Sequence, residues 1–219
     1  MMPGAGADVL ANDPCVKMRI TPAVMVVGRP GGCSAGAQLS ARFHAMVDGW
    51  SITFEDVSVN VVDDESPGGI KQILRGVTGG VPAGSVVAVM GPTGSGKTTL
   101  LNALAHRGPA PTGEILFSGK RWSPELRRGI GFVEQDDIVI DELTVRESLH
   151  YMARLRLPRA LDAAAKAARV DEIIAMLALG KAAYTKVAQI SGGERKRLCI
   201  GQELLSSPKV LLELLYWLL

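Results

Sequence analysis

The pattern of apolar and polar positions changes its period along the chain. Between residues 52 and 62 apolar side chains recur at nearly every second position, which predicts a strand, and residues 63–69 contain the acidic, Pro and Gly residues of a turn. Residues 85–90 form a continuous β-branched apolar run, which is typical of a buried strand in a parallel sheet. Further short strands are predicted at residues 70–74, 114–117 and 131–134.

Two segments with helical spacing follow glycine-rich turns. The first helix is expected to begin at Gly96 or Lys97, to present three leucines on one face and to end near Gly108. The other follows Ser191 and continues to about Leu205. Each turn therefore leads directly into a helix N-terminus.

Two helices between them have recognisable start signals. Thr144 precedes a helix over residues 145–157, and Glu147 stands three positions later, as a capping box requires. Asp162 begins an alanine-rich helix, for which Gly180 is the expected stop. The segment that contains both helices is thus predicted to be mainly helical.

Composition indicates a globular domain with an N-terminal arm. The 219 residues are 47% hydrophobic and 21% charged, and the net charge of +2 gives no case for nucleic acid as a partner. Residues 1–48, rich in Gly, Ala and Pro, are predicted to be mostly disordered, with a brief strand near residues 24–27; scattered arginines leave organelle targeting open as an alternative. No apolar run approaches the about 20 residues that span a bilayer, so no transmembrane helix is expected.

The first glycine-rich turn has the chemistry of a phosphate cradle. Glycines let backbone N–H groups wrap around phosphates, a lysine supplies charge to the β- and γ-phosphates, and a Ser or Thr hydroxyl can bind Mg²⁺. The pattern G-x-x-x-x-G-K-[ST] is met in full by Gly91, Pro92, Thr93, Gly94, Ser95, Gly96, Lys97 and Thr98. The sequence therefore predicts a nucleotide-binding loop between a strand and a helix.

The second turn gains meaning from the first. Ser191, Gly192 and Gly193 alone predict only a helix cap. Together with the nucleotide loop, they make the chain resemble the nucleotide-binding domain of an ABC transporter, most closely of the G subfamily. The stretches that match are residues 91–104, 113–116, 131–137, 143–149, 155–158, 191–197 and 201–208.

This resemblance implies a fold and a domain plan. The expected fold is α/β, a P-loop NTPase core of the ABC type with an antiparallel β arm near residues 50–77 and a helical subdomain at about 138–197. The whole nucleotide-binding domain is expected to cover residues 50–219 and to be incomplete at its C-terminal side.

The resemblance also implies a function and the residues that carry it. ATP would lie on residues 91–98 together with Thr99, Mg²⁺ on Thr98 and Gln135, and Gln135 would also reach the attacking water. The second turn, from Ser191 to Gly193, would contact ATP held by an opposing nucleotide-binding domain, so a dimer is expected. A transmembrane domain would hold this ATPase at the cytoplasmic side of a membrane and export an unknown substrate.

The chain departs from the family pattern at its catalytic carboxylates. Leu214 and Leu215 stand where the pattern has a magnesium-binding Asp and a general-base Glu, and strand alternation places Glu213 on a different face. Two readings follow: an ATPase whose acidic pair is missing through truncation, or a nucleotide-binding or regulatory domain that does not hydrolyse ATP.

Five further expectations concern single side chains. The adenine-stacking aromatic of the family would fall near Val59, with Phe54 and Trp50 as alternatives. His106 and His150 are expected to be surface helix residues, and Lys196 and Arg197 to form a solvated helix face.

Overall fold

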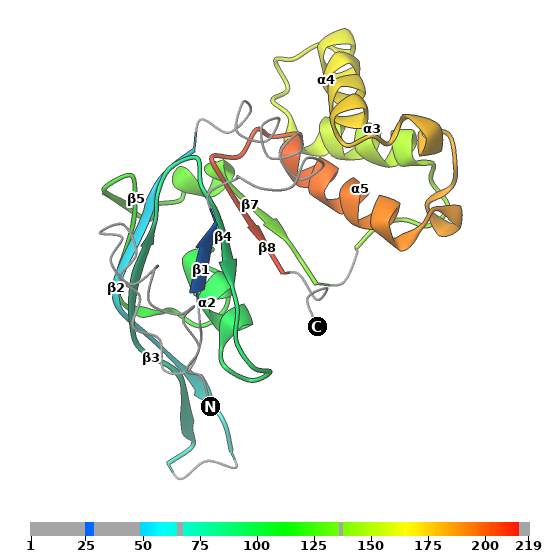
Figure 1. The fold of residues 1–219 in the computed structure, drawn as a ribbon. Helices are drawn as coiled ribbons and strands as arrows, with labels where there is room; N and C mark the ends of the chain where they lie inside the picture. The colour runs from blue at the N-terminus through cyan, green and yellow to red at the C-terminus, as the bar shows by residue number, and fades with distance from the viewer. Residues whose placement is uncertain (1–24, 29–48, 65–67, 136–137, 215–219) are drawn as a thin grey trace, which may run out of the picture. The chain divides into compact units, whose positions relative to one another are not determined.

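The computed structural model describes residues 25–28, 49–64, 68–135 and 138–214 (Figure 1). The chain divides into two compact units, of which the first ends at Ser123 and the second begins at Pro124. Apart from residues 25–28, the predicted N-terminal arm lies outside the described residues. The division into this arm and one domain with a helical subdomain at 138–197 stays a prediction.

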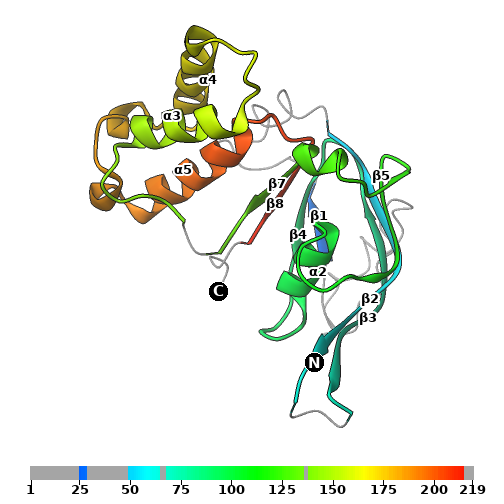
Figure 2. The same ribbon diagram turned by 180° about the vertical axis from the view of Figure 1, so that it is seen from behind.

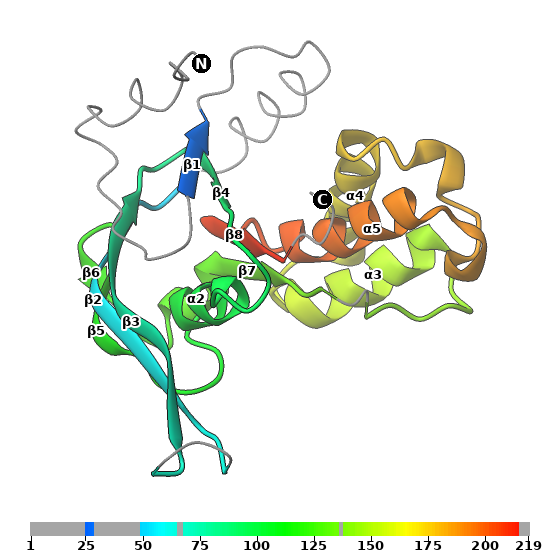
Figure 3. The same ribbon diagram turned by 60° about the horizontal axis from the view of Figure 1, so that its bottom comes forward.

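The first unit is built on a four-stranded antiparallel sheet in the order β3-β2-β5-β6. Along β2 buried and exposed residues alternate, with Ile52 and Phe54 each 2% exposed, because one face of the sheet covers the core. Figure 3 shows β2 and β3 side by side as a long ribbon. The four strands are β2 (Ile52–Val62), β3 (Ile70–Val81), β5 (Thr112–Phe117) and β6 (Lys120–Arg121).

Strand β3 is longer than the predicted 70–74 because it pairs with β2 over its whole length, from Val62↔Ile70 to Ile52↔Val81. The pairing shifts around Asp56, which adopts a left-handed backbone with φ 52°. The Asp56 N–H is satisfied by the Thr78 hydroxyl at 3.0 Å. A side-chain acceptor thus replaces the ladder bond that the bulge removes.

The strand before the nucleotide loop differs from its prediction. β4 (Val86–Val89) pairs antiparallel with β1 (Met25–Gly28), and Val86 is 60% exposed, whereas the apolar run predicted a buried parallel strand. A run of β-branched residues indicates extended backbone but carries no information about which strand pairs with it. The prediction was right about the strand and wrong about its direction and burial.

The helix that follows the loop, α2 (Lys97–Leu104), ends earlier than expected. His106 takes a left-handed φ of 51°, and its N–H bonds to the Ala103 carbonyl while the Arg107 N–H reaches the Asn102 carbonyl. This is a Schellman ending with histidine in the usual glycine position. His106 therefore follows the C-cap Ala105 and lies outside the helix. Its ring stacks on Trp122 with 4.7 Å between centroids, so its prediction as a surface helix residue was wrong.

The described residues of the second unit form a parallel strand pair and three α-helices (Figure 2). The pair consists of β7 (Ile130–Val133) and β8 (Val210–Glu213), and short 3₁₀ turns cover Leu126–Gly129, Gly180–Ala182 and Val187–Gln189. The helices are α3 (Val145–Arg156), α4 (Ala163–Met176) and α5 (Gly192–Leu204). Fully buried residues from all three, such as Leu149, Ile173 and Leu198, form their common core.

The predicted helix starts are confirmed, whereas the end of α4 is not. Thr144 and Glu147 form the expected capping box, and the Asp162 carboxylate accepts the Ala165 N–H at 2.7 Å. Helix α4 stops before Gly180, because Ala178 has φ 53° and the Leu179 N–H bonds to the Ile174 carbonyl. The stop is again a Schellman ending without glycine.

Candidate functional site

The nucleotide loop joins β4 to α2 in the first unit, and two of its glycines are required by backbone shape. Gly94 and Gly96 have φ values of 82° and 89°, which side-chain-bearing residues rarely adopt. A Cβ at Gly96 would also lie 2.8 Å from a methyl carbon of Leu74. The loop can therefore pass close to β3 only with glycine at this position.

The N-terminus of α2 is open to an anion. Its N-cap, Gly96, has no side chain to accept the first N–H groups, and no acidic residue stands in the first turn. The Ser95 hydroxyl oxygen is buried and has no hydrogen-bond partner among the described residues. Uncapped N–H groups at the positive end of a helix, beside an unsatisfied hydroxyl, fit a phosphate group.

The Lys97 side chain hydrogen-bonds to the backbone at the start of the nucleotide loop. Its ammonium donates to the carbonyls of Gly91 at 2.7 Å and Pro92 at 2.8 Å. An ammonium has three N–H donors, so one remains for a phosphate oxygen. Thr98, in the first turn of α2, is exposed, which leaves its hydroxyl accessible to a metal ion.

Ser191 caps α5 in the second unit. Its hydroxyl accepts the Glu194 N–H at 3.3 Å and donates to the Glu194 carboxylate at 2.7 Å, and the Ser191 N–H donates to the same carboxylate at 2.9 Å. Gly192 and Gly193 follow, both exposed and neither with positive φ. A Cβ at Gly192 would meet nothing within 4 Å, so packing within the chain does not require glycine there.

Gln135 lies in an exposed bend directly after β7. The nucleotide loop belongs to the first unit, whereas Gln135 and Ser191 both belong to the second. Each group of predicted site residues is therefore described within its own unit, and their assembly around one nucleotide stays a prediction.

Lys196, predicted with Arg197 to form a solvated helix face, makes a bond in this region that the sequence did not indicate. Its ammonium donates to the Glu134 carbonyl at 2.9 Å, next to Gln135, in an exposed hydrogen bond, so the predicted solvated helix face also makes a bond within the chain. A bond to a backbone carbonyl that is distant in sequence leaves no trace in residue pattern, because every residue offers that acceptor.

The family position of the metal-binding Asp is apolar in the structure as well. Leu214 directly follows β8, and its N–H donates to the Val133 carbonyl at 3.1 Å, which extends the pairing of Glu213 with Val133. Within the described ranges no three His, Cys, Asp or Glu side chains are grouped closely enough to hold a metal ion.

The candidate adenine-stacking residues lie mostly in the core. Val59 and Phe54 are each 2% exposed, so neither presents a side chain to a base. Trp50 is half-buried and packs edge-on against Phe117, with ring centroids 6.3 Å apart.

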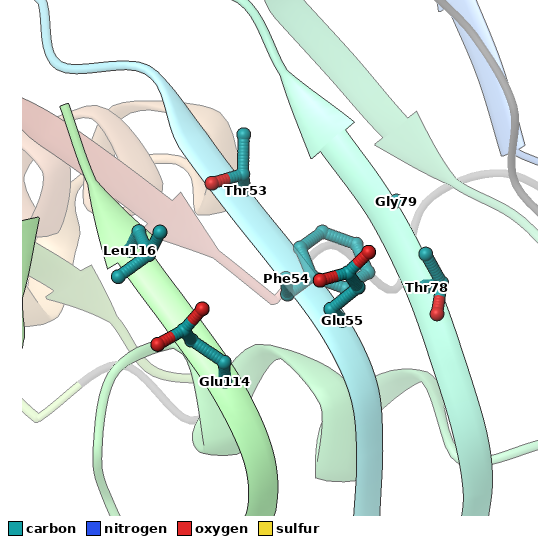
Figure 4. A pocket seen from close by; sticks show the side chains of 7 residues that line it. All are labelled: Thr53, Phe54, Glu55, Thr78, Gly79, Glu114 and Leu116. Carbon is teal, nitrogen blue, oxygen red and sulfur yellow. The ribbon is translucent and has the colours of Figure 1, made fainter. Parts of the chain in front are cut away.

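A hollow of about 230 Å³ lies on the β2–β3–β5 sheet (Figure 4). Glu55 and Glu114 stand opposite each other across β2 and β5, and the Glu114 carboxylate is paired with Arg121 at 2.6 Å. An acidic wall repels phosphate, so this hollow does not extend the nucleotide loop. Its lining residues are Thr53, Phe54, Glu55, Thr78, Gly79, Glu114 and Leu116.

Among the described residues, none of the helices has the length and apolar character needed to span a bilayer.

The chain is similar to known proteins along most of its length. A model of the ABC transporter family matches residues 74–213. ABC transporter G family member 22 of Arabidopsis thaliana is 42% identical over 169 residues, which are 74% of this chain and 22% of that protein. Protein scarlet of Drosophila melanogaster is 38% identical (78% and 27%), and protein white of the same species is 42% identical (65% and 22%). The chain thus spans about a quarter of the length of these relatives.

A solved structure shares the fold. It is the ATP-binding cassette MJ0796, described as dimeric, in a post-hydrolysis state and bound to ADP and Pi. The TM-score is 0.54 at 23% identity, over 74% of this chain and 72% of the other. This similarity confirms the predicted α/β fold of a P-loop NTPase of the ABC type.

Proposed function

Because the chain belongs to the ABC transporter family, we propose that it binds Mg²⁺-ATP on residues 91–99 and is the ATPase domain of a G-type transporter. The observation that carries this proposal is the uncapped N-terminus of α2 beside Lys97 and the unsatisfied Ser95 hydroxyl. The alternative of a regulatory domain without hydrolysis is not favoured, because the relatives are ABC transporters of the G family.

Several residues of the nucleotide loop have a proposed contact with the phosphates or with Mg²⁺. The N–H groups of Gly94 and of residues 96–98 bind the phosphate oxygens, whereas the Ser95 N–H donates to the Pro92 carbonyl at 3.2 Å. The third N–H of the Lys97 ammonium donates to an oxygen of the β- or γ-phosphate. Thr98 and Gln135 are the proposed ligands of Mg²⁺, and the ion, when bound, neutralises phosphate charge and orients the oxygens. The exposed Thr98 hydroxyl and the exposed Gln135 are consistent with these roles.

Ser191, Gly192 and Gly193 are proposed to bind ATP held by a second copy of this domain. The open space around Gly192 supports this, since its lack of a side chain serves no contact within the chain and instead permits another molecule to approach the backbone. The N-terminus of α5 offers N–H groups to that phosphate. The described dimer of the related cassette is consistent with such pairing.

A transmembrane domain is the second proposed partner. Several relatives, among them two G family members of Arabidopsis thaliana, are named ABC transporters, and the chain spans about a quarter of the length of its relatives. We therefore infer that this domain works at the cytoplasmic side of a membrane, attached through that partner, and that it drives export of an unknown substrate.

Calorimetric titration of the full chain with Mg²⁺-ATP tests the proposal. Wild type is expected to bind, and Lys97→Ala to lose at least about tenfold in affinity, because a charge-assisted phosphate contact contributes about 1.5–3 kcal/mol. Lys120→Ala removes the same charge from an exposed strand of the same unit and is expected to bind like wild type. Absence of binding by a folded wild type, or equal loss in both variants, would overturn the proposal.

A further inference from the structure

Helix α5 is bonded to strand β7 by two side chains from one of its faces. The Lys196 ammonium donates to the Glu134 carbonyl at 2.9 Å, and the Glu203 carboxylate accepts the Phe132 N–H at 3.4 Å. Lys196 and Glu203 are seven residues apart, which is two helical turns and about 10 Å along the axis. The two bonds therefore attach α5 to β7 and to the residue directly after it, along one edge of the strand.

That edge of β7 is the one turned away from β8. The carbonyls of Gly129 and Val133 accept N–H groups from Lys209 and Leu214, so the backbone groups of the odd-numbered residues face β8. Backbone groups of alternate residues in a strand point to opposite edges. Those of Phe132 and Glu134 consequently face α5, where Glu203 and Lys196 satisfy them.

The opposite side of α5 is fixed to the other two helices. A Cβ at Gly201 would lie 3.0 Å from side-chain carbons of both Ile173 and Leu177, so the helices approach as closely as glycine allows. The buried Gln202 amide donates to the Ser148 hydroxyl at 2.9 Å. Helix α5 is thus one body with α3 and α4, and its bonds to β7 connect this body to the segment that ends in Gln135.

We propose that Lys196 is a positioning residue that transmits movement of the Glu134–Gln135 segment into α5 and so sets the position of Ser191. The inference rests on the proposed function, in which Gln135 senses Mg²⁺ and Ser191 binds nucleotide across a dimer. Lys196 lies five residues after Ser191, in the second turn of a continuous helix. A shift of the Glu134 carbonyl is therefore applied close to the cap that Ser191 forms.

The bond to the Glu134 carbonyl needs an N–H donor at the end of a long side chain, and the variants are chosen to remove or keep that donor. Lys196→Met keeps much of the apolar stem and removes the donors, whereas Lys196→Arg keeps charge and N–H groups. Lys181→Met is the matched control, because it removes the same charge from an exposed 3₁₀ turn of the same unit.

The experiment measures ATP-driven dimerisation of the full chain by analytical ultracentrifugation, with hydrogen exchange of residues 131–135 and 191–199. Lys196→Met is expected to bind Mg²⁺-ATP like wild type but to need about five- to tenfold more ATP to dimerise, in the range of ordinary coupling energies. Its ATP-induced protection should persist at 131–135 and disappear at 191–199. Lys196→Arg should restore both properties, and Lys181→Met should match wild type.

Wild-type dimerisation by Lys196→Met, failure of arginine to rescue, or loss of protection in both segments would each overturn the positioning role. Ser191→Arg separates this from failure of the proposed function, because its undiminished dimerisation would refute the role of Ser191 itself. If the wild type binds ATP without dimerising, the proposed dimer is refuted. The role of Lys196 is then tested by hydrogen exchange alone: in the ATP-bound monomer, Lys196→Met must exchange faster than wild type at residues 191–199, and Lys181→Met must not.

Discussion

The Ser191 hydroxyl donates its only hydrogen bond to the Glu194 carboxylate, at 2.7 Å, and its oxygen accepts the Glu194 N–H at 3.3 Å. A phosphate oxygen is an acceptor, so it can bind this hydroxyl only if the proton turns away from the carboxylate. Glu194 therefore stabilises the start of α5 and competes with the phosphate that Ser191 is proposed to bind.

Glu194→Gln is expected to reduce this competition. The glutamine oxygen can still accept the Ser191 N–H, but the negative charge that opposes phosphate at the helix N-terminus is removed. We expect dimerisation at about two- to fivefold lower ATP concentration, the size of an ordinary charge effect at a helix end. Ultracentrifugation with increasing ATP measures this, and an unchanged or higher ATP requirement with intact helix content would contradict it.

The same carboxylate should make stability depend on acid pH. Hydrogen bonds from the Ser191 hydroxyl and then from its N–H lower the pKa of Glu194 below 4.5, and bonds from the Thr144 N–H and then its hydroxyl lower the pKa of Glu147 likewise. A carboxyl whose folded pKa is lowered contributes stability that is present above about pH 4.5 and is lost as pH falls through the folded pKa.

Urea unfolding between about pH 3 and 7 tests this contribution. The wild type is expected to lose stability below about pH 4.5, and the double variant Glu147→Gln/Glu194→Gln to show a shallower loss. Glu142→Gln, which neutralises an exposed carboxylate before α3, is the control. Parallel profiles for the double variant and wild type would show that the capping boxes do not contribute.

Both boxes were predictable in position because the capping residues and their partners are close in sequence, as at Thr144 and Glu147. The two Schellman endings were missed because Ala178 and His106 occupy a left-handed position for which sequence reasoning expects glycine. Tertiary packing explains both cases: the adjacent Leu179 is fully buried, and His106 stacks on Trp122. Local rules thus located the helix starts, whereas packing decided where α2 and α4 end.

The candidate site divides in the same way. The loop that contains Lys97 was predictable because all its phosphate-binding groups are consecutive. The partner of residues 85–90 and the bond from Lys196 to Glu134 were not, because both depend on a backbone group from elsewhere in the chain. Contacts made to backbone are invisible in a single sequence, since they impose no residue type on the acceptor.

His106 should give a second, separate pH response. Burial lowers the pKa of its imidazole below the usual 6.5, because the charged form is disfavoured against Trp122 and Phe117. A lowered folded pKa means that the unfolded chain takes up the proton first, so stability is lost as pH falls below about 6.5. His106→Asn, which tolerates the left-handed backbone, should flatten the change between about pH 7 and 5. The control His150→Asn, on α3, should keep the loss of stability of the wild type over this range. Thermal unfolding of both variants at each pH measures the difference, and equal flattening in the two would contradict the role of His106.

Substitution by alanine is expected to affect different properties at Gly96 and Gly192, because only the backbone and surroundings of Gly96 within the chain require glycine. Alanine at Gly96 meets a φ of 89° and a Leu74 methyl carbon at 2.8 Å, so Gly96→Ala should destabilise the fold by about 1–3 kcal/mol and abolish Mg²⁺-ATP binding. Alanine at Gly192 meets neither, so Gly192→Ala should unfold like wild type and bind ATP as a monomer, yet dimerise poorly because its methyl group occupies the approach to the α5 N-terminus. Urea midpoints and ultracentrifugation measured on both variants separate the two effects. If Gly192→Ala dimerises like wild type, the proposal that another molecule approaches the backbone at Gly192 is contradicted.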